Sequence, residues 1–351
     1  MVRRGRSRRK KKGPGAAGVL FGLFLVALAA AGATAWLVFV PAGPESETFV
    51  EVAPGSSSTQ VGIQLEKAGV IRSRFGFDAV RLWKRGVLKA GEYRFDHAVP
   101  VTEVYSRIAR GDVFTLPVTI PEGATRFEIA DRIEKAGFAK KEDFLAATVK
   151  ETRLIADLDP QARTLEGYLF PDTYRFPRKA TANQIIMAMV HRFRIIAAQI
   201  GLRNGNATQS VHATVTLASL VERETAVNAE RPLVASVLTN RLAKKMPLMT
   251  DPAVIYGLQL AGKWRGTIYQ SDLAYDTPYN TYRHAGLPPG PIANPGLPSL
   301  RAALAPAATD YLYFVAAGAD PQGRSRFAAT IDEHNRNVAS YRQAVKLAGG
   351  R

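Results

Sequence analysis

Two glutamates close an apolar stretch near the middle of the chain. The run from Val211 to Val221 is mostly apolar, and Glu222 and Glu224 follow it directly. At about 100° per residue, the run predicts a helix that is apolar on more than one face, which is typical of a buried helix. Carboxylates at the end of such a helix are costly unless they are paired or used chemically. The two side chains lie roughly 200° apart around the helix, so they cannot easily share one proton.

Two interpretations of this pair remain open. In the first, both carboxylates pair with arginines, of which Arg223 and Arg231 are close in sequence. In the second, one carboxylic acid lies in an apolar pocket that raises its pKa, as a general acid requires. Glu222 falls within about 40° of the apolar stripe through Val215, whereas Glu224 lies on the opposite side of the helix.

The N-terminus combines a basic cluster with an uncharged run. Eight of the 47 lysine and arginine residues lie within residues 1–12, so the formal net charge of +17 is partly a local feature. The run Gly18–Val40 is long enough to cross a bilayer as a helix and too long for a typical signal-peptide core. Basic residues precede the run and none follows it directly, which predicts a cytoplasmic N-terminus. We therefore expect residues 1–17 in the cytoplasm, a transmembrane helix over 18–40 and the rest outside, with a cleaved signal as the alternative.

The composition and the missing motifs exclude several kinds of chemistry. The chain has no cysteine, which excludes disulfides, thiol catalysis and cysteine-type metal sites. It also has no phosphate-binding glycine loop, dinucleotide fingerprint, His-Glu-x-x-His motif or Gly-x-Ser-x-Gly elbow. We expect no metal, no cofactor and no nucleic-acid partner. Buried glutamates suit carbohydrate chemistry, because cleavage of a glycosidic bond needs an acid at the leaving oxygen.

The hydrophobic pattern predicts an α+β chain. A linker over 41–47 leads to a small α/β module at 48–115, and a larger mixed α/β domain covers 116–351. The module is expected to recur in the second domain, because the spacing of its glycines and its Tyr-Arg-Phe strand are both repeated there. The repeated residues are Gly55, Gly69 and Tyr93–Phe95 in the first copy, and Gly123, Gly137 and Tyr174–Phe176 in the second.

Two further segments have compositions that suit a binding cleft. Residues 164–174 are dense in aromatic residues with interleaved acids, and such surfaces bind sugar rings and their hydroxyls, although a packed turn is the alternative. Residues 275–296 are rich in proline and glycine, which fix the shape of a long loop. A long ordered loop is usually functional.

Five motifs in the same order carry a resemblance to a known family. They are Glu166–Tyr174, Ala218–Thr225, Thr250–Gly257, Tyr279–Tyr282 and Gly286–Ile292. Together they strongly resemble the MltG-type (YceG-like) endolytic murein transglycosylases, with similarity from about residue 45 to residue 345.

The resemblance implies a bacterial inner-membrane lyase whose catalytic domain faces the periplasm or outer face. It implies a LysM-like module at 48–115, followed by a YceG-like catalytic domain at 116–351. It further implies cleavage of the MurNAc-β-1,4-GlcNAc bond within nascent peptidoglycan strands, which leaves 1,6-anhydro-MurNAc ends and terminates elongation, beside peptidoglycan synthases as partners.

The resemblance also implies the residues of the site. The catalytic glutamate corresponds to Glu222, which agrees with its position at the end of an apolar stripe. The role of Glu224, structural or catalytic, stays open. Substrate-binding residues are expected at Glu166, Tyr168, Phe170, Asp172, Tyr174, Glu224, Asp251, Tyr256, Tyr279, Asn280, Thr281, Tyr282 and Pro289.

The expected mechanism needs only one acid–base group. Protonated Glu222 gives its proton to the leaving oxygen, the substrate's acetamido group attacks the anomeric carbon, and Glu222 then takes the proton from the muramyl O6 hydroxyl. A hydrolytic muramidase and a non-catalytic peptidoglycan-binding membrane anchor are the alternatives.

Overall fold

The computed structural model describes residues 15–203, 210–318 and 323–349. The expected basic tail lies outside the described residues up to position 14. The chain divides into two compact units, Met1–Thr115 and Leu116–Arg351, which are described separately below. The mixed α/β class is confirmed, and helices predominate over three short antiparallel strand pairs in the described residues.

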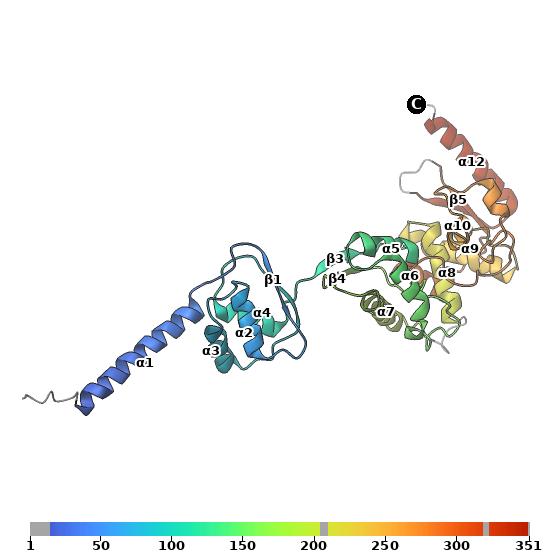
Figure 1. The fold of residues 1–351 in the computed structure, drawn as a ribbon. Coiled ribbons are helices and arrows are strands. Elements are labelled where there is room, and N and C mark those ends of the chain that lie inside the picture. Colours follow the sequence, from blue (N-terminus) through green and yellow to red (C-terminus); the bar gives the residue numbers. More distant parts are fainter. Residues whose placement is uncertain (1–14, 204–209, 319–322, 350–351) are drawn as a thin grey trace, which may run out of the picture. The chain divides into compact units, whose positions relative to one another are not determined.

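The N-terminal unit joins a long apolar helix to a small α/β module (Figure 1). The elements of this unit are α1 (Ala16–Phe39), β1 (Thr48–Val52), α2 (Ser58–Lys67), α3 (Arg74–Lys84), β2 (Gly91–Phe95) and α4 (Val101–Arg110). Among the described residues, α1 is the only helix long and apolar enough to cross a membrane. Its last turn enters the core of the module, where Val38 is buried beside Val50, Phe77 and Val104.

The larger unit begins with a second copy of the strand–helix pattern. Its first elements are β3 (Leu116–Thr119), α5 (Arg126–Lys135), α6 (Lys141–Lys150), η1 (Thr152–Leu154), β4 (Thr173–Phe176) and α7 (Ala182–Gln199). Val50 lies opposite Tyr93 in the first strand pair, and Val118 lies opposite Tyr174 in the second. Both α2 and α5 begin with a capping box. The shared register supports the predicted duplication, and the second copy has a longer connection between α6 and β4 than the first has between α3 and β2.

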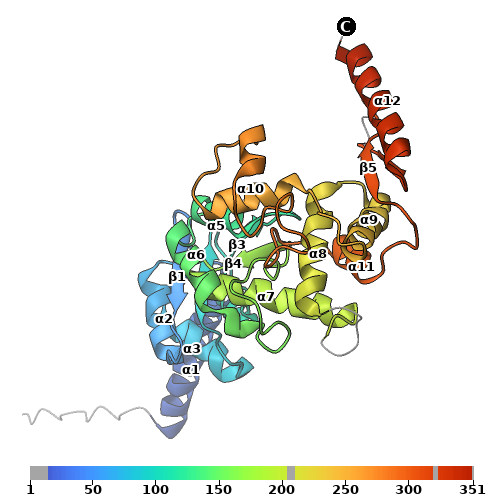
Figure 2. The same cartoon turned by 90° about the vertical axis from the view of Figure 1, so that its right-hand side faces the viewer.

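The rest of this unit surrounds α8 (Val211–Glu224). The remaining elements are η2 (Asn228–Glu230), α9 (Arg231–Ala243), α10 (Asp251–Leu260), η3 (Gln270–Ala274), α11 (Leu297–Leu304), β5 (Tyr313–Ala316), β6 (Ser325–Ala328) and α12 (Ile331–Gly349). Figure 2 shows α8 beside α9 and α11, with α10 above. Every residue from Thr214 to Val221 is buried, so the prediction of a helix buried on several faces is confirmed.

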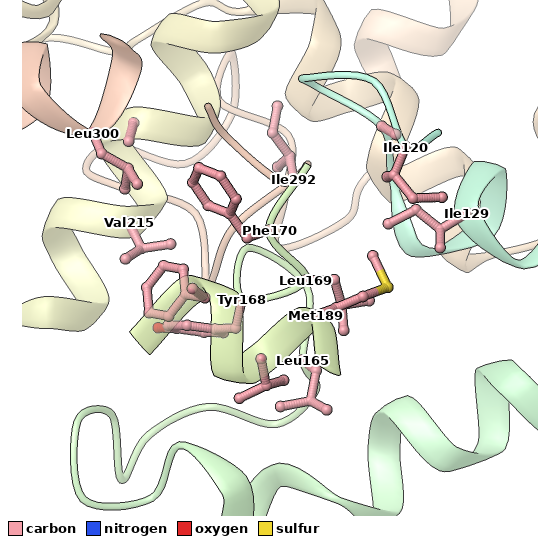
Figure 3. Packing of buried hydrophobic residues seen from close by; sticks show 14 of the residues in the cluster. Ile120, Ile129, Leu165, Tyr168, Leu169, Phe170, Met189, Val215, Ile292 and Leu300 are labelled. Carbon is pink, nitrogen blue, oxygen red and sulfur yellow. The ribbon is translucent and has the colours of Figure 1, made fainter. Parts of the chain in front are cut away.

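The core of the larger unit joins the aromatic segment to α8 and the proline-rich loop. Figure 3 shows Tyr168 and Phe170 packed near Val215 and Leu300, with Ile292 of the loop beside them. The proline- and glycine-rich stretch from 286 to 296 has neither helix nor strand, as expected. It is nevertheless buried from Pro291 to Gly296, which fixes it against the end of α8.

Candidate active site

The two glutamates of α8 lie in different surroundings. The side chain of Glu222 is 4% exposed and forms an ion pair with Arg231, whose Nη2 lies 2.8 Å from Oε1. Its Oε2 accepts a hydrogen bond of 2.9 Å from the backbone N–H of Gly296. Both carboxylate oxygens are therefore bonded inside the protein, one of them to a buried guanidinium, so the contacts of Glu222 are those of a structural group.

A second carboxylate, Glu122, stands beside this ion pair. Its Oε2 lies 3.7 Å from Nη1 of Arg231, and its side chain is 46% exposed. Partial burial and the negative charge of Glu222 raise the pKa of Glu122 above its ordinary value. Two carboxylates, Glu122 and Glu222, thus share one buried cation, Arg231, on this side of α8.

Glu224 lines a cavity of about 240 Å³ on the other side of α8. No hydrogen bond or ion pair holds its carboxyl group within the described part of the chain. Burial raises the pKa of Glu224 to about 7, and the nearby charge of Asp251 acts in the same direction while Arg241 opposes it. A carboxyl group with this pKa is about half protonated at neutral pH, as a general acid requires.

Asp251 and Tyr282 form the polar wall of this cavity. The hydroxyl of Tyr282 donates a hydrogen bond of 2.6 Å to Oδ1 of Asp251, the first residue of α10. This pair is positioned by Thr281, whose Oγ1 accepts from the N–H of Thr250 at 2.9 Å. Asn280 orders the turn, since its Oδ1 accepts from the N–H of Tyr282 at 3.0 Å. The Thr-Asp-Pro and Tyr-Asn-Thr-Tyr motifs are therefore joined at the cavity.

Arg241 supplies the positive charge of the cavity, although the sequence analysis did not single it out. It is fixed by two backbone acceptors, the carbonyl oxygens of Leu312 at 2.7 Å and Leu248 at 2.8 Å. Met249, the residue after Leu248, has a positive φ of 53°, an uncommon conformation for a residue with a side chain. Such backbone outliers cluster at functional sites. Arg241 lies on α9, 17 residues after Glu224, and only the folded chain brings the two side chains together. The sequence alone therefore gave no direct signal for it.

The aromatic segment 164–174 is mainly part of the core rather than a wall of a cleft. Glu166 is 1% exposed and accepts two hydrogen bonds from the N–H of Arg126, at 3.0 and 2.9 Å, and one of 2.6 Å from Nδ2 of Asn294. Tyr168 is fully buried and donates to Asp159. We therefore do not retain these two side chains as sugar contacts, because they are enclosed and already bonded.

The other expected residues of this segment have mostly internal partners as well. Phe170 is buried, and the hydroxyl of Tyr174 donates to the Phe170 carbonyl oxygen at 2.6 Å. Asp172 is half-buried and pairs with Arg192 at 2.8 Å. Asn280 and Thr281 are also buried, so they orient the site rather than line it. The packed-turn alternative describes residues 164–174 better than the sugar-binding one.

A second cavity of about 250 Å³ collects three more of the expected residues, Tyr256, Tyr279 and Pro289. His212, in the first turn of α8, also lines it and was not predicted. Its Nδ1 lies 2.7 Å from Oδ2 of Asp159, and its Nε2 lies 3.0 Å from the carbonyl oxygen of Pro289. The hydrogen bond to Asp159 raises the pKa of His212. The histidine therefore joins α8 to the proline-rich loop.

The arrangement supports acid–base chemistry. Glu224 can give and take a proton, and Asp251, Tyr282 and Arg241 surround it with polar and charged groups. The described residues contain no group of three or more His, Asp or Glu side chains that could hold a metal ion. Fold and site thus define a class: an α+β protein with an apolar N-terminal helix and a polar cleft built around a protonatable glutamate.

Comparisons with known proteins narrow this class to one family. The sequence model described as "YceG-like family" matches residues 50–340, and the chain belongs to this family. A Bacillus subtilis protein named "Endolytic murein transglycosylase" is 35% identical over 86% of the chain and 87% of its own length. A Streptococcus pneumoniae protein of the same name is 30% identical over 92% of the chain, which spans 64% of that longer relative.

The fold has a solved counterpart. A crystal structure of a yceG-like protein from Listeria monocytogenes matches 83% of this chain and 99% of its own, with 35% sequence identity and a TM-score of 0.55. The resemblance that the five sequence motifs carry is therefore confirmed at the level of the family.

Proposed function

We propose that this chain is an endolytic murein transglycosylase, a lyase that cleaves the MurNAc-β-1,4-GlcNAc bond within nascent glycan strands. The name shared by its Bacillus and Streptococcus relatives supports the activity. The structural observation that carries the proposal is the cavity around Glu224, where burial raises the pKa of a carboxyl group to about 7. The products are strands with 1,6-anhydro-MurNAc ends, so elongation stops at the cleaved end.

The acid of this proposal is Glu224 rather than Glu222. Both carboxylate oxygens of Glu222 are bonded within the protein, to Arg231 at 2.8 Å and to the Gly296 N–H at 2.9 Å. Neither oxygen is therefore free to reach the glycosidic oxygen of a substrate. Glu224 has no such donor and lies against open space, which suits a group that must exchange a proton with substrate. The two side chains still leave α8 in different directions, as the helix geometry predicted.

Glu224 acts twice in the proposed reaction, first as an acid and then as a base. Protonated Glu224 gives its proton to the glycosidic oxygen as the bond to the anomeric carbon breaks, and the acetamido oxygen of the same sugar bonds to that carbon. The Glu224 carboxylate then takes the proton from the muramyl O6 hydroxyl. The O6 oxygen bonds to the anomeric carbon, the acetamido group leaves it, and the anhydro ring closes without water. The acid is regenerated in its starting form.

The remaining cavity residues bind and orient the strand. Tyr282 and Asp251 present hydrogen-bonding groups beside the acid, and Arg241 limits how far the pKa of Glu224 rises. Tyr256, Tyr279 and Pro289 line the second cavity, and α10 runs from Asp251 at the first cavity to Leu260 at the second. We assign both cavities to successive sugars of one strand.

The proposal places the larger unit outside the cytoplasmic membrane, with α1 as a single span and the basic tail in the cytoplasm. The burial of Val38 in the core of the module supports a retained helix, because cleavage after this residue would remove part of that core. The LysM-like module implied for residues 48–115 is proposed on the β1–α2–α3–β2 order and the antiparallel strand pair. Peptidoglycan synthases are the proposed partners of the anchored enzyme.

Product analysis separates this function from its alternatives. The full chain in detergent or bilayers is incubated with uncrosslinked glycan strands in ¹⁸O-labelled water, and the released fragments are analysed by mass spectrometry. A lytic transglycosylase yields internal cleavage products with anhydro ends and no ¹⁸O. Incorporation of one ¹⁸O at each new reducing end identifies a muramidase, and the absence of cleavage identifies a binding protein.

A further inference from the structure

Four large apolar side chains are strongly exposed on one short stretch of the N-terminal unit. Phe75, Leu82 and Trp83 of α3 are 64%, 75% and 68% exposed, and Val87, three residues beyond the helix, is 80% exposed. Apart from α1 and the residue after it, no other described large apolar side chain of this unit is exposed. A concentrated apolar patch marks an interaction site.

The geometry of α3 places three of these side chains, Phe75, Leu82 and Trp83, on one side of the helix. At about 100° per residue, Phe75 and Leu82 share a stripe and Trp83 lies beside it. Phe77 and Val80 lie on the other side of the helix, where they are buried in the core of the module. The helix is therefore apolar toward its own core and, separately, toward the outside, which an ordinary surface helix is not.

Basic side chains border the exposed apolar face. Arg74 and Arg81 lie along one edge of α3 with the acidic Asp78, and Arg85 directly follows the last turn of the helix. Two of these arginines donate to carbonyl oxygens: Arg81 donates to Gly86, and Arg85 donates to Leu82 at 3.4 Å. The edge keeps a net positive charge next to aromatic and aliphatic groups, a combination typical of helices that lie in a membrane interface.

The beginning of α3 is fixed at the end of α1. A Cβ atom on Gly76 would lie 3.3 Å from Cβ of Leu37, so the two backbones approach closely there. Arg72, just before α3, donates to the carbonyl oxygens of Val40 and Pro41, both at 2.8 Å. Figures 1 and 2 both show α3 beside the C-terminal end of α1.

Arg72 contacts Trp36, which lies in the last turns of α1. The Arg72 guanidinium lies 4.6 Å from the centre of the Trp36 ring, which is itself half exposed near the end of the apolar helix. Tryptophan and arginine at the end of a span are typical of the boundary between hydrocarbon and headgroups. The patch on α3 thus begins at the level where α1 leaves the bilayer.

We propose that the exposed face of α3 is a second membrane-contact surface, which rests in the interface of the leaflet that α1 leaves. Phe75, Leu82, Trp83 and Val87 enter the boundary of the acyl region, and the arginines of the adjoining edge bind lipid phosphates. The inference rests on the placement of α1 as a membrane span in the proposed function. A single span leaves a module free to rotate about the helix axis, whereas a second contact turns one face of the module to the bilayer.

Cysteine labelling tests this surface directly, because the natural chain has no cysteine. Leu82→Cys in the full chain is labelled with a small fluorophore and reconstituted in phosphatidylglycerol-containing nanodiscs. Quenching by lipids brominated on the acyl chain is compared with quenching by aqueous iodide. Leu25→Cys in α1 serves as the control for insertion, and Ala53→Cys in the exposed turn after β1 serves as the water-exposed control. Melting temperatures verify that each variant is folded.

The proposal expects brominated lipid to quench the Leu82 and Leu25 labels, while iodide quenches only the Ala53 label. Arg74→Gln together with Arg85→Gln is expected to reduce the lipid-contacting fraction at position 82 by about fivefold per arginine. Three results would overturn it. A Leu82 label as open to iodide as Ala53 refutes the contact. A label shielded from both quenchers places a protein surface on the patch instead. An unquenched Leu25 label removes the span on which the inference rests. None of these readouts depends on catalysis.

Discussion

Replacement of Glu224 by glutamine gives opposite effects on activity and on stability. The substitution keeps the shape and removes the proton that the reaction transfers, so the rate should fall by roughly 10²–10⁴-fold. Its effect on folding follows from the pKa, which rises from the ordinary 4.5 to about 7 in the folded protein. Protonation of Glu224 stabilises the fold at low pH, and this contribution is lost as the pH rises through about 7. Above that value the charged group costs about 3 kcal/mol of folding free energy.

The neutral variant Glu224→Gln should therefore have a higher melting temperature than the natural chain at pH 8 to 9, and a similar one near pH 4. Anhydro-product formation and thermal unfolding are measured for both proteins across this range. The matched control is Glu222→Gln, which leaves buried Arg231 with only the more distant, half-exposed Glu122 as a charge partner. Loss of one member of a buried pair costs about 3–5 kcal/mol, so this variant should lose stability first and activity only as a consequence. An inactive but fully stable Glu222→Gln, beside an active Glu224→Gln, would show that Glu222 and not Glu224 is the acid.

Three further predictions follow from single contacts. Tyr282→Phe removes the hydrogen bond to Asp251 and should raise KM more than it lowers kcat, as steady-state kinetics on defined strands would reveal; an unchanged KM argues against a substrate-facing role. His212→Gln should abolish the part of the stability that is present below pH 6.5 and lost as the pH rises through the elevated pKa of the histidine, which melting curves from pH 5 to 9 would detect as a flatter profile. Asn294→Ala leaves the backbone N–H groups of Gly167 and Leu169 buried and unpaired, so chemical denaturation should report a loss of about 2–6 kcal/mol in the free energy of unfolding.

The sequence was most informative where pattern and packing depend on local residues. The mostly apolar run before Glu222 predicted a buried helix, because a helix that is apolar on more than one face must bury each of those faces. The repeated glycines and Tyr-Arg-Phe strands predicted a duplication, and the two strand pairs share their register. Both features are encoded within a few turns of chain and do not depend on distant partners.

The roles of the two glutamates could not be predicted in the same way. The helix period placed Glu222 and Glu224 on different sides of α8, but the identity of the facing cation depends on distant chain segments. Arg231 begins α9 and reaches Glu222, whereas Arg241 lies near the end of α9 and faces Glu224. The apolar stripe that favoured Glu222 describes the helix interior, and it carries no information about the groups beyond its end.

Composition also could not separate buried aromatic residues from exposed ones. Tyr168 and Glu166 have the chemistry of a sugar-binding surface, but Asp159 and Asn294 enclose and bond them in the core. The helix α3 was missed for a related reason, since Phe75, Phe77 and Leu82 place apolar groups on two faces and obscure a single 3.6-residue stripe. Each case needs the neighbouring surface to be known before the residue type can be interpreted.

The central claim is that burial keeps the carboxyl group of Glu224 protonated near neutral pH so that it can act as the acid. The most direct test is a titration of the glutamate carboxyl carbons by ¹³C NMR in the full chain, with Glu224→Gln used to assign the signal. The resonance lost in this variant should titrate with a midpoint of about 7. A midpoint near the ordinary value of 4.5 for that resonance would contradict it.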